Sequence, residues 1–279
     1  MTIKALIDAD IVAYTAAHAT CTWVTNDDGE DEPWPDVKAA GEFVDEIIRA
    51  WTKNSQADVP VCVLSPDDRT NYRLLVWPAY KTHRKSSRKP PHLGEVIQYI
   101  RDQWDGYHVP YLEGDDVLGI LHTRDPENTV VVSTDKDMTT VPGWHYNPNK
   151  DAELGPRYVC PMMADRWLQT QVLTGDATDG YKGAKGIGPK KADTVLHSHY
   201  VLERQGDQFV LKGDPAAAWA DIMDTFRVTG QDGAEAVQNL AMARILHTDL
   251  FRKTKGERFI QLPTDTWGVN KEFKLPCTS

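Results

Sequence analysis

The chain is poor in cysteine and has no long hydrophobic run, and each absence excludes a class of protein. Its four cysteines are scattered, with no C-x-x-C pair, which excludes the common cysteine-based zinc sites and a disulfide framework and indicates reduced thiols. No apolar stretch approaches the roughly 20 residues that span a bilayer. The first residues, MTIKALIDAD, have acids directly after a short apolar run, unlike a signal peptide. We therefore expect a cytoplasmic protein without a membrane partner.

Basic residues are also scarce relative to acids. The formal net charge of −10 argues at first against a nucleic-acid partner. Nine acids belong to the candidate site described below, however, and without them the net charge is −1. The stretch KTHRKSSRK at 81–89 holds five Lys or Arg, and four lysines lie between 182 and 191. Such clusters can bind phosphate groups. An acidic run at 27–32 is interpreted as a solvated loop.

Three short apolar runs, at 3–7, 61–64 and 130–132, each lead into carboxylates, and this is the most informative pattern in the sequence. Short apolar runs between helical stretches are typical of buried parallel strands, and open α/β sheets bind ligands beyond the carboxyl ends of their strands. Acids gathered at one edge repel one another unless they are protonated or bind a cation, and oxygen ligands favour Mg²⁺ or Mn²⁺. The pattern predicts a divalent metal cluster. The acids after the three runs are Asp8 and Asp10, Asp67 and Asp68, and Asp135 and Asp137.

The order of predicted elements divides the chain in two. Helical periodicity at 43–51 and 93–104, a helix from about 113 and a further strand at 143–146 alternate with the three strands. This alternation predicts an α/β fold, with a mostly parallel sheet flanked by helices, over residues 1–160. From residue 161 helical segments at 163–173, 192–200, 216–226 and 234–246 predict an α-helical lobe over 161–279. The segment after residue 253 is expected to be irregular.

Two further acidic motifs occur at predicted helical turns. Glu113-Gly114-Asp115-Asp116 places three acids at a helix start, where each can stabilise the helix dipole by up to about 1 kcal/mol. Capping needs only one or two acids, so the neighbouring strand-end acids favour metal binding here. Asp176 and Asp179 are spaced i and i+3, which puts both carboxylates on one side of a turn or forms a simple cap.

A glycine-rich segment, GAKGIGPKKA at 183–192, follows directly. Gly-Ile-Gly before proline and a helix is the pattern of a helix-hairpin-helix motif, predicted at about 175–200. Its glycines let a phosphate approach the backbone, and the first N–H groups of the helix offer an anion site. The alternative is a tight turn between packed helices, but the cluster of lysines without an intervening acid favours phosphate binding. The expected DNA contacts are Lys185, Gly186, Gly188, Lys190 and Lys191.

A second basic element, at about 72–92, lies between Asp67 and the acids at 113–116. Runs of charge are commonly solvated loops. The position of this run instead favours an arch over the metal cluster, where a basic strip suits a single-stranded phosphodiester backbone. Its residues include Tyr80-Lys81-Thr82-His83-Arg84, followed by Lys85, Arg88 and Lys89.

These motifs, in this order, closely resemble the flap endonuclease/5′–3′ exonuclease superfamily, and in particular the small free-standing exonucleases of bacteriophages. The resemblance spans roughly residues 3–196, and the order of five motifs makes it specific. Two departures stand out, because Asp10 is an extra acid without an assigned role and Gly114 replaces the usual alanine. The resemblance depends on Asp8, Asp67 with Arg73 and Tyr80-Lys81-x-x-Arg84, Glu113-Gly-Asp115-Asp116, Ser133-Thr-Asp135-Lys-Asp137, and Gly175-Asp176-x-x-Asp179-Gly180.

The resemblance implies a PIN-like nuclease domain, two Mg²⁺ or Mn²⁺ ions, and K⁺ in the helix-hairpin-helix. It implies that Lys81 and Arg84 neutralise charge on the scissile phosphate. The implied metal ligands are Asp8, Asp67, Glu113, Asp115, Asp116, Asp135, Asp137, Asp176 and Asp179. Further DNA contacts are implied for Arg73, Tyr80, Lys85, Arg88 and Lys89, although Tyr80 can equally serve packing.

The implied substrate is duplex DNA with a 5′ end, a nick or a 5′ flap, cleaved to 5′-phosphorylated products. The implied setting is phage replication, recombination and primer removal in the host cytoplasm. A polymerase and a single-strand binding protein would then act in trans.

Three other functions fit parts of the sequence. Asp8-Ala-Asp10-Ile-Val after a strand also matches the start of a haloacid-dehalogenase-like phosphatase, with Asp8 as nucleophile and Asp10 as acid or base. That alternative leaves the basic strip and the Gly-Ile-Gly segment without a role. A non-catalytic binder of branched DNA gives no reason to gather nine mutually repelling acids. A PIN-type ribonuclease is weakened by the helix-hairpin-helix, which suits duplex DNA.

Overall fold

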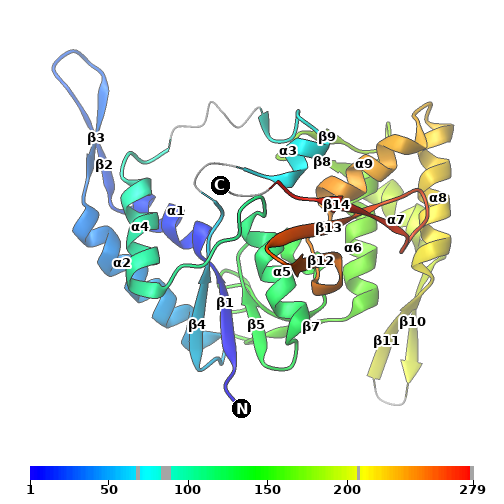
Figure 1. Ribbon diagram of the computed structural model, residues 1–279, viewed down its shortest axis with the longest axis horizontal. Coiled ribbons are helices and arrows are strands. Elements are labelled where there is room, and N and C mark those ends of the chain that lie inside the picture. The colour runs from blue at the N-terminus through cyan, green and yellow to red at the C-terminus, as the bar shows by residue number, and fades with distance from the viewer. Residues whose placement is uncertain (67–69, 83–88, 206–207, 277–279) are drawn as a thin grey trace. The chain divides into compact units, whose positions relative to one another are not determined.

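The computed structural model describes residues 1–66, 70–82, 89–205 and 208–276 (Figure 1). The chain divides into two compact units. The first comprises Met1–Thr70, Ser86–Met138 and Trp144–Tyr158, and the second comprises Asn71–Lys85, Thr139–Gly143 and Val159–Ser279. Two short segments from the first 160 residues therefore belong to the second unit.

The first unit is built around a five-stranded sheet in the order β4-β1-β5-β6-β7. Its strands are β4 (Val59–Val63), β1 (Lys4–Asp8), β5 (Thr129–Val132), β6 (Gly143–Tyr146) and β7 (Arg157–Val159). β1 runs parallel to both β4 and β5, and β5 runs parallel to β6. This confirms the mostly parallel sheet that the apolar runs predicted. Because β1, β4 and β5 share one direction, the chain leaves all three at the same edge.

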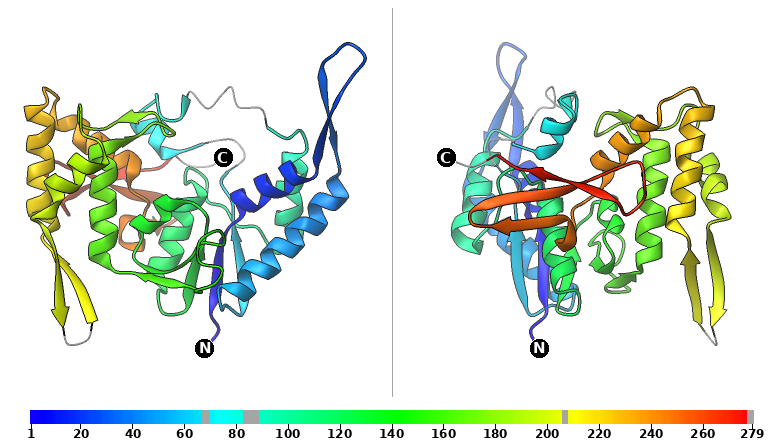
Figure 2. Two further views of the ribbon diagram at one scale, coloured as in Figure 1. Left: turned by 180° about the vertical axis from the view of Figure 1, so that it is seen from behind. Right: turned by 45° about the vertical axis from the view of Figure 1, so that its right-hand side comes forward.

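Helices cover both faces of this sheet (Figure 1 and Figure 2). Ala5 and Ile7 of β1 point into a core shared with α1, α2 and α4, whereas Leu6 between them is buried on the other face. α5 packs on β1, β4 and β5 outside that core. Burial on two faces explains why the strands read as continuous apolar runs. The helices are α1 (Ala9–Ala19), α2 (Val37–Asn54), α4 (Leu93–Trp104) and α5 (Gly114–Arg124).

Asp45 of α2 accepts three hydrogen bonds, two of which join α2 to α4. Its Oδ1 accepts from Tyr99 Oη at 3.1 Å and from Trp104 Nε1 at 2.9 Å, and its Oδ2 accepts from Arg49 at 2.7 Å. The Arg49 guanidinium also lies 5.6 Å from the Trp104 ring centroid. Hydrogen bonds to a partly buried charged acceptor are each worth more than neutral ones.

Asp45→Ala is expected to destabilise the first unit by about 2–3 kcal/mol, because it removes three hydrogen bonds and leaves the Tyr99 and Trp104 donors without this acceptor. Urea unfolding followed by tryptophan fluorescence measures the change. The matched control is Asp102→Ala, which removes an exposed carboxylate of α4 bonded to Gln98 and should cost less than about 0.5 kcal/mol. Equal effects of the two substitutions would contradict this role for Asp45.

The acidic run at 27–32 is not simply a loop. β2 (Cys21–Thr25) pairs with β3 (Asp31–Pro35) in an antiparallel hairpin, and Asn26 closes its turn by accepting from the backbone N–H groups of Asp28 and Glu30. Trp34 is 75% exposed. The expectation of a loop was therefore partly wrong. Pro33 and Pro35 lie within β3, which pairs with β2 on one side, and proline is tolerated in such a strand.

The second unit is organised around four helices, α6 (Pro161–Thr174), α7 (Pro189–His197), α8 (Pro215–Val228) and α9 (Gly233–Ala243), with the short α3 (Tyr72–Val76). Trp219 and Phe226 of α8 pack with Leu173, Leu196 and the ring of Tyr80 in one core. The predicted helical lobe is thus present. None of the helices in the described part of the chain is both long and apolar enough to cross a membrane.

The strands of the second unit that follow residue 250 were absent from the sequence prediction. β12 (Phe251–Thr254), β13 (Glu257–Pro263) and β14 (Asn270–Lys274) form an antiparallel sheet, so the expectation of an irregular tail was wrong. The turn between β12 and β13 is Lys255-Gly256, with φ of 49° and 82°, values that a two-residue hairpin requires. Two small hairpins join β8 (Gly175–Asp176) to β9 (Tyr181–Lys182) and β10 (Tyr200–Gln205) to β11 (Gln208–Gly213).

Candidate functional site

Asp8 lies at the carboxyl end of β1 and caps α1. The Ser133 hydroxyl donates to its Oδ2 at 2.8 Å, and the Ile11 amide donates weakly to its Oδ1 at 3.4 Å. Ser133 Oγ in turn accepts from the Asp135 amide at 3.0 Å. A single hydroxyl therefore links the acid after β1 to the segment after β5, as the parallel register of these strands predicts.

The electrostatic environment of Asp8 is unfavourable for a lone carboxylate. Burial, which leaves Asp8 only 5% exposed, and repulsion from Asp10 raise its pKa from 3.8 to about 7, and Asp135 adds to the repulsion. The hydrogen bonds from Ser133 and Ile11 act in the opposite direction without cancelling the effect. A buried acid flanked by two others is the environment that a cation would stabilise.

The acids at the start of α5 also have a structural role. Asp116 is fully buried, and its Oδ2 accepts from the Glu113 amide at 3.2 Å, while the Glu113 side chain accepts from the Asp116 amide. This reciprocal arrangement is a capping box. Asp115 lies between them in the same first turn. The structure thus shows the capping role of this motif, and its metal-binding role stays a prediction.

Asp135 and Asp137 flank Lys136 at the start of a short 3₁₀ helix, Lys136–Thr140. The Asp137 amide donates to Asp135 Oδ1 at 2.8 Å, which orients the Asp135 carboxylate toward the start of this helix. Among the described residues, no three carboxylates stand close enough to form a ready metal-binding group. The acids of the first unit are thus neighbours that repel one another, not a closed ligand shell. Asp67 and Asp68 lie outside the described residues.

Asp176 and Asp179 belong to the second unit, in the turn between β8 and β9. Asp176 Oδ1 accepts from the amides of Thr178 and Asp179 at 2.6 and 3.2 Å. Asp179 is bound from the other side, because Tyr80 Oη donates to its Oδ2 at 3.0 Å and Lys81 Nζ lies 3.6 Å from its Oδ1. The structure therefore brings Tyr80 and Lys81 into contact with Asp179. Their separation in the sequence gave no indication of this contact.

Two glycines fix the base of this turn. A Cβ on Gly175, whose φ is +70°, would lie 2.2 Å from the amide nitrogen of Gly183, and a Cβ on Gly183 would lie 2.2 Å from the carbonyl oxygen of Leu173. The backbones cross too closely here for any side chain. Asn239 of α9, which is 2% exposed, donates to the carbonyls of Val172 and Lys182 at 3.2 and 2.7 Å and holds the crossing together.

The Gly-Ile-Gly segment enters α7 as the sequence predicted. Gly186 has a φ of +75°, Gly188 precedes the helix, and a Cβ at either position would meet nothing within 4 Å. The backbone is therefore open to an incoming group. Lys191 Nζ donates to the Gly186 carbonyl at 2.9 Å, and the Lys185 amide donates to Gln231 Oε1 at 2.6 Å. Gln231 is a contact that sequence reasoning missed. Lys190 is exposed.

The remaining basic residues differ in their surroundings. Arg73 is only 2% exposed, and its guanidinium donates to the carbonyls of Met242 and Arg244 at 3.0 and 2.7 Å and stacks 4.7 Å from the Tyr72 ring centroid. This environment gives Arg73 a structural role. Lys89 is exposed. The predicted positions Arg84, Lys85 and Arg88 lie outside the described residues.

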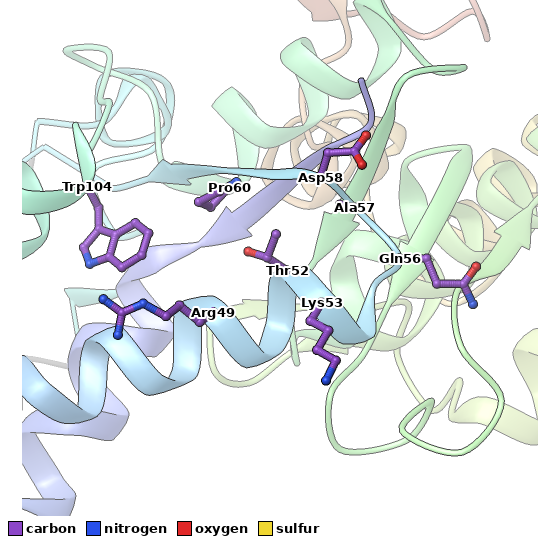
Figure 3. A pocket seen from close by; sticks show the side chains of 8 residues that line it. All are labelled: Arg49, Thr52, Lys53, Gln56, Ala57, Asp58, Pro60 and Trp104. Carbon is purple, nitrogen blue, oxygen red and sulfur yellow. The ribbon is translucent and has the colours of Figure 1, made fainter. Parts of the chain in front are cut away.

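A cavity of about 520 Å³ lies elsewhere in the first unit (Figure 3). Arg49 and Lys53 of α2 line it together with Trp104 of α4 and Pro60 near the start of β4. Asp8, by contrast, pairs with Val63 at the opposite end of β4. None of the predicted site residues that the structure describes lines this cavity, so the candidate site stays at the acid-bearing edge of the sheet.

Comparison with known proteins agrees with this architecture. Residues 4–147, just over half of the chain, match the family of the 5′–3′ exonuclease N-terminal, resolvase-like domain. The exodeoxyribonuclease of Enterobacteria phage T3 is 28% identical over 90% of this chain and 89% of its own length.

Solved structures share the fold at low sequence identity. A T5 protein co-crystallised with metal ions has a TM-score of 0.61 at 12% identity, over 86% of this chain and 88% of that one. The bacteriophage T5 flap endonuclease in a complex with DNA and metal ions has a TM-score of 0.55 at 14% identity, over the same shares. The family match argues against the phosphatase interpretation of Asp8 and Asp10. The chain belongs to the family of the 5′–3′ exonuclease N-terminal, resolvase-like domain.

Proposed function

We propose that this chain hydrolyses DNA as a two-metal 5′–3′ exonuclease and 5′-flap endonuclease, on duplexes with a 5′ end, a nick or a flap. The observation that carries the proposal is Asp8, a carboxylate at the carboxyl edge of a parallel sheet, whose burial, together with repulsion from Asp10 and Asp135, raises its pKa to about 7. Such repulsion has no benefit for stability alone, and a divalent cation would relieve it. Co-crystallisation of the related T5 protein with metal ions supports this choice.

The carboxylates fit hard divalent ions, since they offer only oxygen ligands. Bound Mg²⁺ or Mn²⁺ would supply a polarised water and stabilise charge on the leaving 3′ oxygen. The hydrogen bond from Ser133 would orient the Asp8 carboxylate before a metal ion binds. Not every acid can be a direct ligand, because Mg²⁺ keeps several waters. The proposed ligand set, some acting through water, is Asp8, Asp67, Glu113, Asp115, Asp116, Asp135, Asp137, Asp176 and Asp179.

Lys81 and Arg84 are the proposed partners of the scissile phosphate. Asp179 orients Lys81 on two sides, since its carboxylate lies 3.6 Å from Lys81 Nζ and its backbone carbonyl accepts from the Lys81 amide at 3.0 Å. An ammonium group held in this way can neutralise charge as it develops in the transition state. Tyr80, which is 3% exposed, is better suited to support Asp179 than to stack on a base.

Duplex DNA is the proposed partner of the helix-hairpin-helix. The unobstructed Gly186 and Gly188 would let a phosphate approach the amides that open α7, with Lys185, Lys190 and Lys191 nearby. K⁺ is a further proposed cation at the helix-hairpin-helix. The T5 flap endonuclease complex, which contains DNA and metal ions, supports this substrate class. A polymerase and a single-strand binding protein in trans, within a host cytoplasm, complete the proposal.

The test is hydrolysis of a duplex labelled at its 5′ or its 3′ end, beside a 5′-flap substrate, with Mg²⁺ or with EDTA. We expect loss of the 5′ label only with Mg²⁺. Asp135→Ala should reduce the rate on the order of 1,000-fold, since it removes a ligand worth several kcal/mol in the transition state. Asp102→Ala, the exposed control on α4, should cleave like the wild type. Release of the 3′ label first, or cleavage in EDTA, would refute the proposal.

A further inference from the structure

Asp10, the extra acid of the sequence, is held by the segment that follows β4. Its Oδ2 accepts from the Ser65 amide at 3.0 Å, and the Ser65 side chain forms a second hydrogen bond with it. Arg101 of α4 attracts the same carboxylate, whereas Glu113 repels it. The Asp10 carboxylate is thus hydrogen-bonded within the protein and does not face open solvent.

Ser65 extends this contact to the start of α5. Its Oγ accepts from the Gly114 amide at 3.0 Å. A Cβ on Gly114 would lie 3.2 Å from Asp10 Oδ2 and 3.5 Å from Ser65 Oγ, and the first of these distances is shorter than ordinary van der Waals contact. The backbone of Gly114 is not in the left-handed region. A methyl group at 114 would therefore press on the carboxylate of Asp10, which would have to shift by a few tenths of an ångström.

Each member of this group stands beside proposed metal ligands. Asp10 follows Asp8 by two residues at the start of α1, and Gly114 separates Glu113 from Asp115 at the start of α5. Ser65 precedes Asp67 by two residues. Three elements that are distant in sequence and carry proposed ligands therefore meet in one hydrogen-bonded contact, Asp10–Ser65–Gly114.

We propose that Asp10 is a positioning residue that, through Ser65, fixes the spacing of the ligand-bearing starts of α1 and α5 and the end of β4, and that Gly114 is the residue this acid requires. The inference rests on the proposed function, because it assigns Asp10 a role toward the same metal site. It accounts for both departures from the family pattern with one contact. An acid at 10 needs the space that an alanine at 114 would occupy.

The main competing role for Asp10 is that of an additional metal ligand. Replacing Asp10 with asparagine distinguishes the two roles. Asp10→Asn keeps an oxygen that can accept from Ser65 but removes the charge. A positioning residue should therefore be rescued by Asn and not by Ala. A metal ligand should lose affinity with both substitutions, since an amide oxygen is a weaker ligand for a hard cation.

The experiment measures Mn²⁺ binding to the DNA-free protein by electron paramagnetic resonance, beside the thermal unfolding midpoint in EDTA. Loss of a residue that orients ligands typically costs about 10–100-fold in metal affinity. We expect Asp10→Ala to raise the Kd for Mn²⁺ by that factor and Asp10→Asn to restore most of it. Gly114→Ala should weaken binding in the wild type but add nothing in the Asp10→Ala background, where its methyl group has room. That coupling is the signature of the contact.

The outcomes separate the two proposals. Additive effects of Asp10→Ala and Gly114→Ala on the Kd for Mn²⁺ would overturn the positioning role, and so would an Asp10→Asn variant that binds Mn²⁺ as weakly as Asp10→Ala. The proposed nuclease function would still stand in either case, provided that the wild type binds Mn²⁺ and cleaves DNA. A wild-type protein that neither binds Mn²⁺ nor cleaves DNA would instead refute the proposed function. If Asp10→Ala does not fold, Gly114→Ala and Asp10→Asn still decide the question, since the first must weaken Mn²⁺ binding and the second must preserve it.

Discussion

Replacing Lys81 with alanine is expected to lower the single-turnover cleavage rate about 100- to 1,000-fold, the usual cost of removing one preorganised group that stabilises a transition state. The side chain of Lys81 is only 23% exposed and is oriented by Asp179, so it is fixed before substrate arrives. Binding of the DNA end should change much less than the rate, because the ammonium group is most valuable when charge develops on the phosphate.

Tyr80→Phe is the matched control for this variant. It removes only the hydroxyl that donates to Asp179 Oδ2 at 3.0 Å and leaves the buried ring in place. We expect a loss of less than about tenfold, the cost of one hydrogen bond. Rapid-quench cleavage of a 5′-labelled duplex, together with a filter-binding Kd, measures both quantities. If the Lys81→Ala protein cleaves as fast as the Tyr80→Phe protein, Lys81 does not stabilise the transition state.

Asp8→Asn is expected to abolish cleavage and, without metal, to make the protein more stable. The carboxyl pKa is 3.8 in the unfolded chain and about 7 in the folded one, so between these values the folded state binds more protons. Its contribution to stability is complete below pH 3.8 and is lost as the pH rises through 7. An amide needs no proton, so the variant should exceed the wild type at pH 8 by up to about 4 kcal/mol.

Urea unfolding in EDTA at pH 5 and pH 8 measures this difference, which should grow with pH. Added Mg²⁺ should then stabilise the wild type and not the variant, because only the wild type binds it in the folded state. Asp102→Asn, with its exposed carboxyl on α4, should show neither effect. A metal-free Asp8→Asn protein that is less stable than the wild type at pH 8 would contradict the unfavourable environment assigned to Asp8.

The sheet and its acidic edge were predictable because strand burial leaves a strong local signal. A strand covered on both faces must be apolar throughout, and an acid directly after it marks the point where the chain leaves the core. The apolar runs therefore located β1, β4 and β5, and the alternation with helices indicated their direction. The strands that follow residue 250 escaped because polar and charged residues interrupt their apolar residues. β13, for example, has apolar residues at Phe259, Ile260 and Leu262 among charged ones.

The contacts within the candidate site were less predictable, because they join residues with no recognisable spacing. Lys81 and Asp179 are 98 positions apart, and nothing local to either identifies the partner. Arg73 belonged to a basic pattern, yet two backbone carbonyls bind its guanidinium in the interior. The role of Asp10 emerged only from the folded structure, since it depends on a glycine more than a hundred residues away.

The crossing of Gly175 and Gly183 also affects how this protein can change. Because the two backbones touch and Asn239 secures them, residues 176–182 form a cassette closed at its base. Substitutions or insertions at the exposed Ala177 and Thr178 extend outward, whereas Tyr181 packs in the core and any side chain at either glycine would force the base apart. The tip of this turn can therefore vary, provided that both glycines and the asparagine are kept.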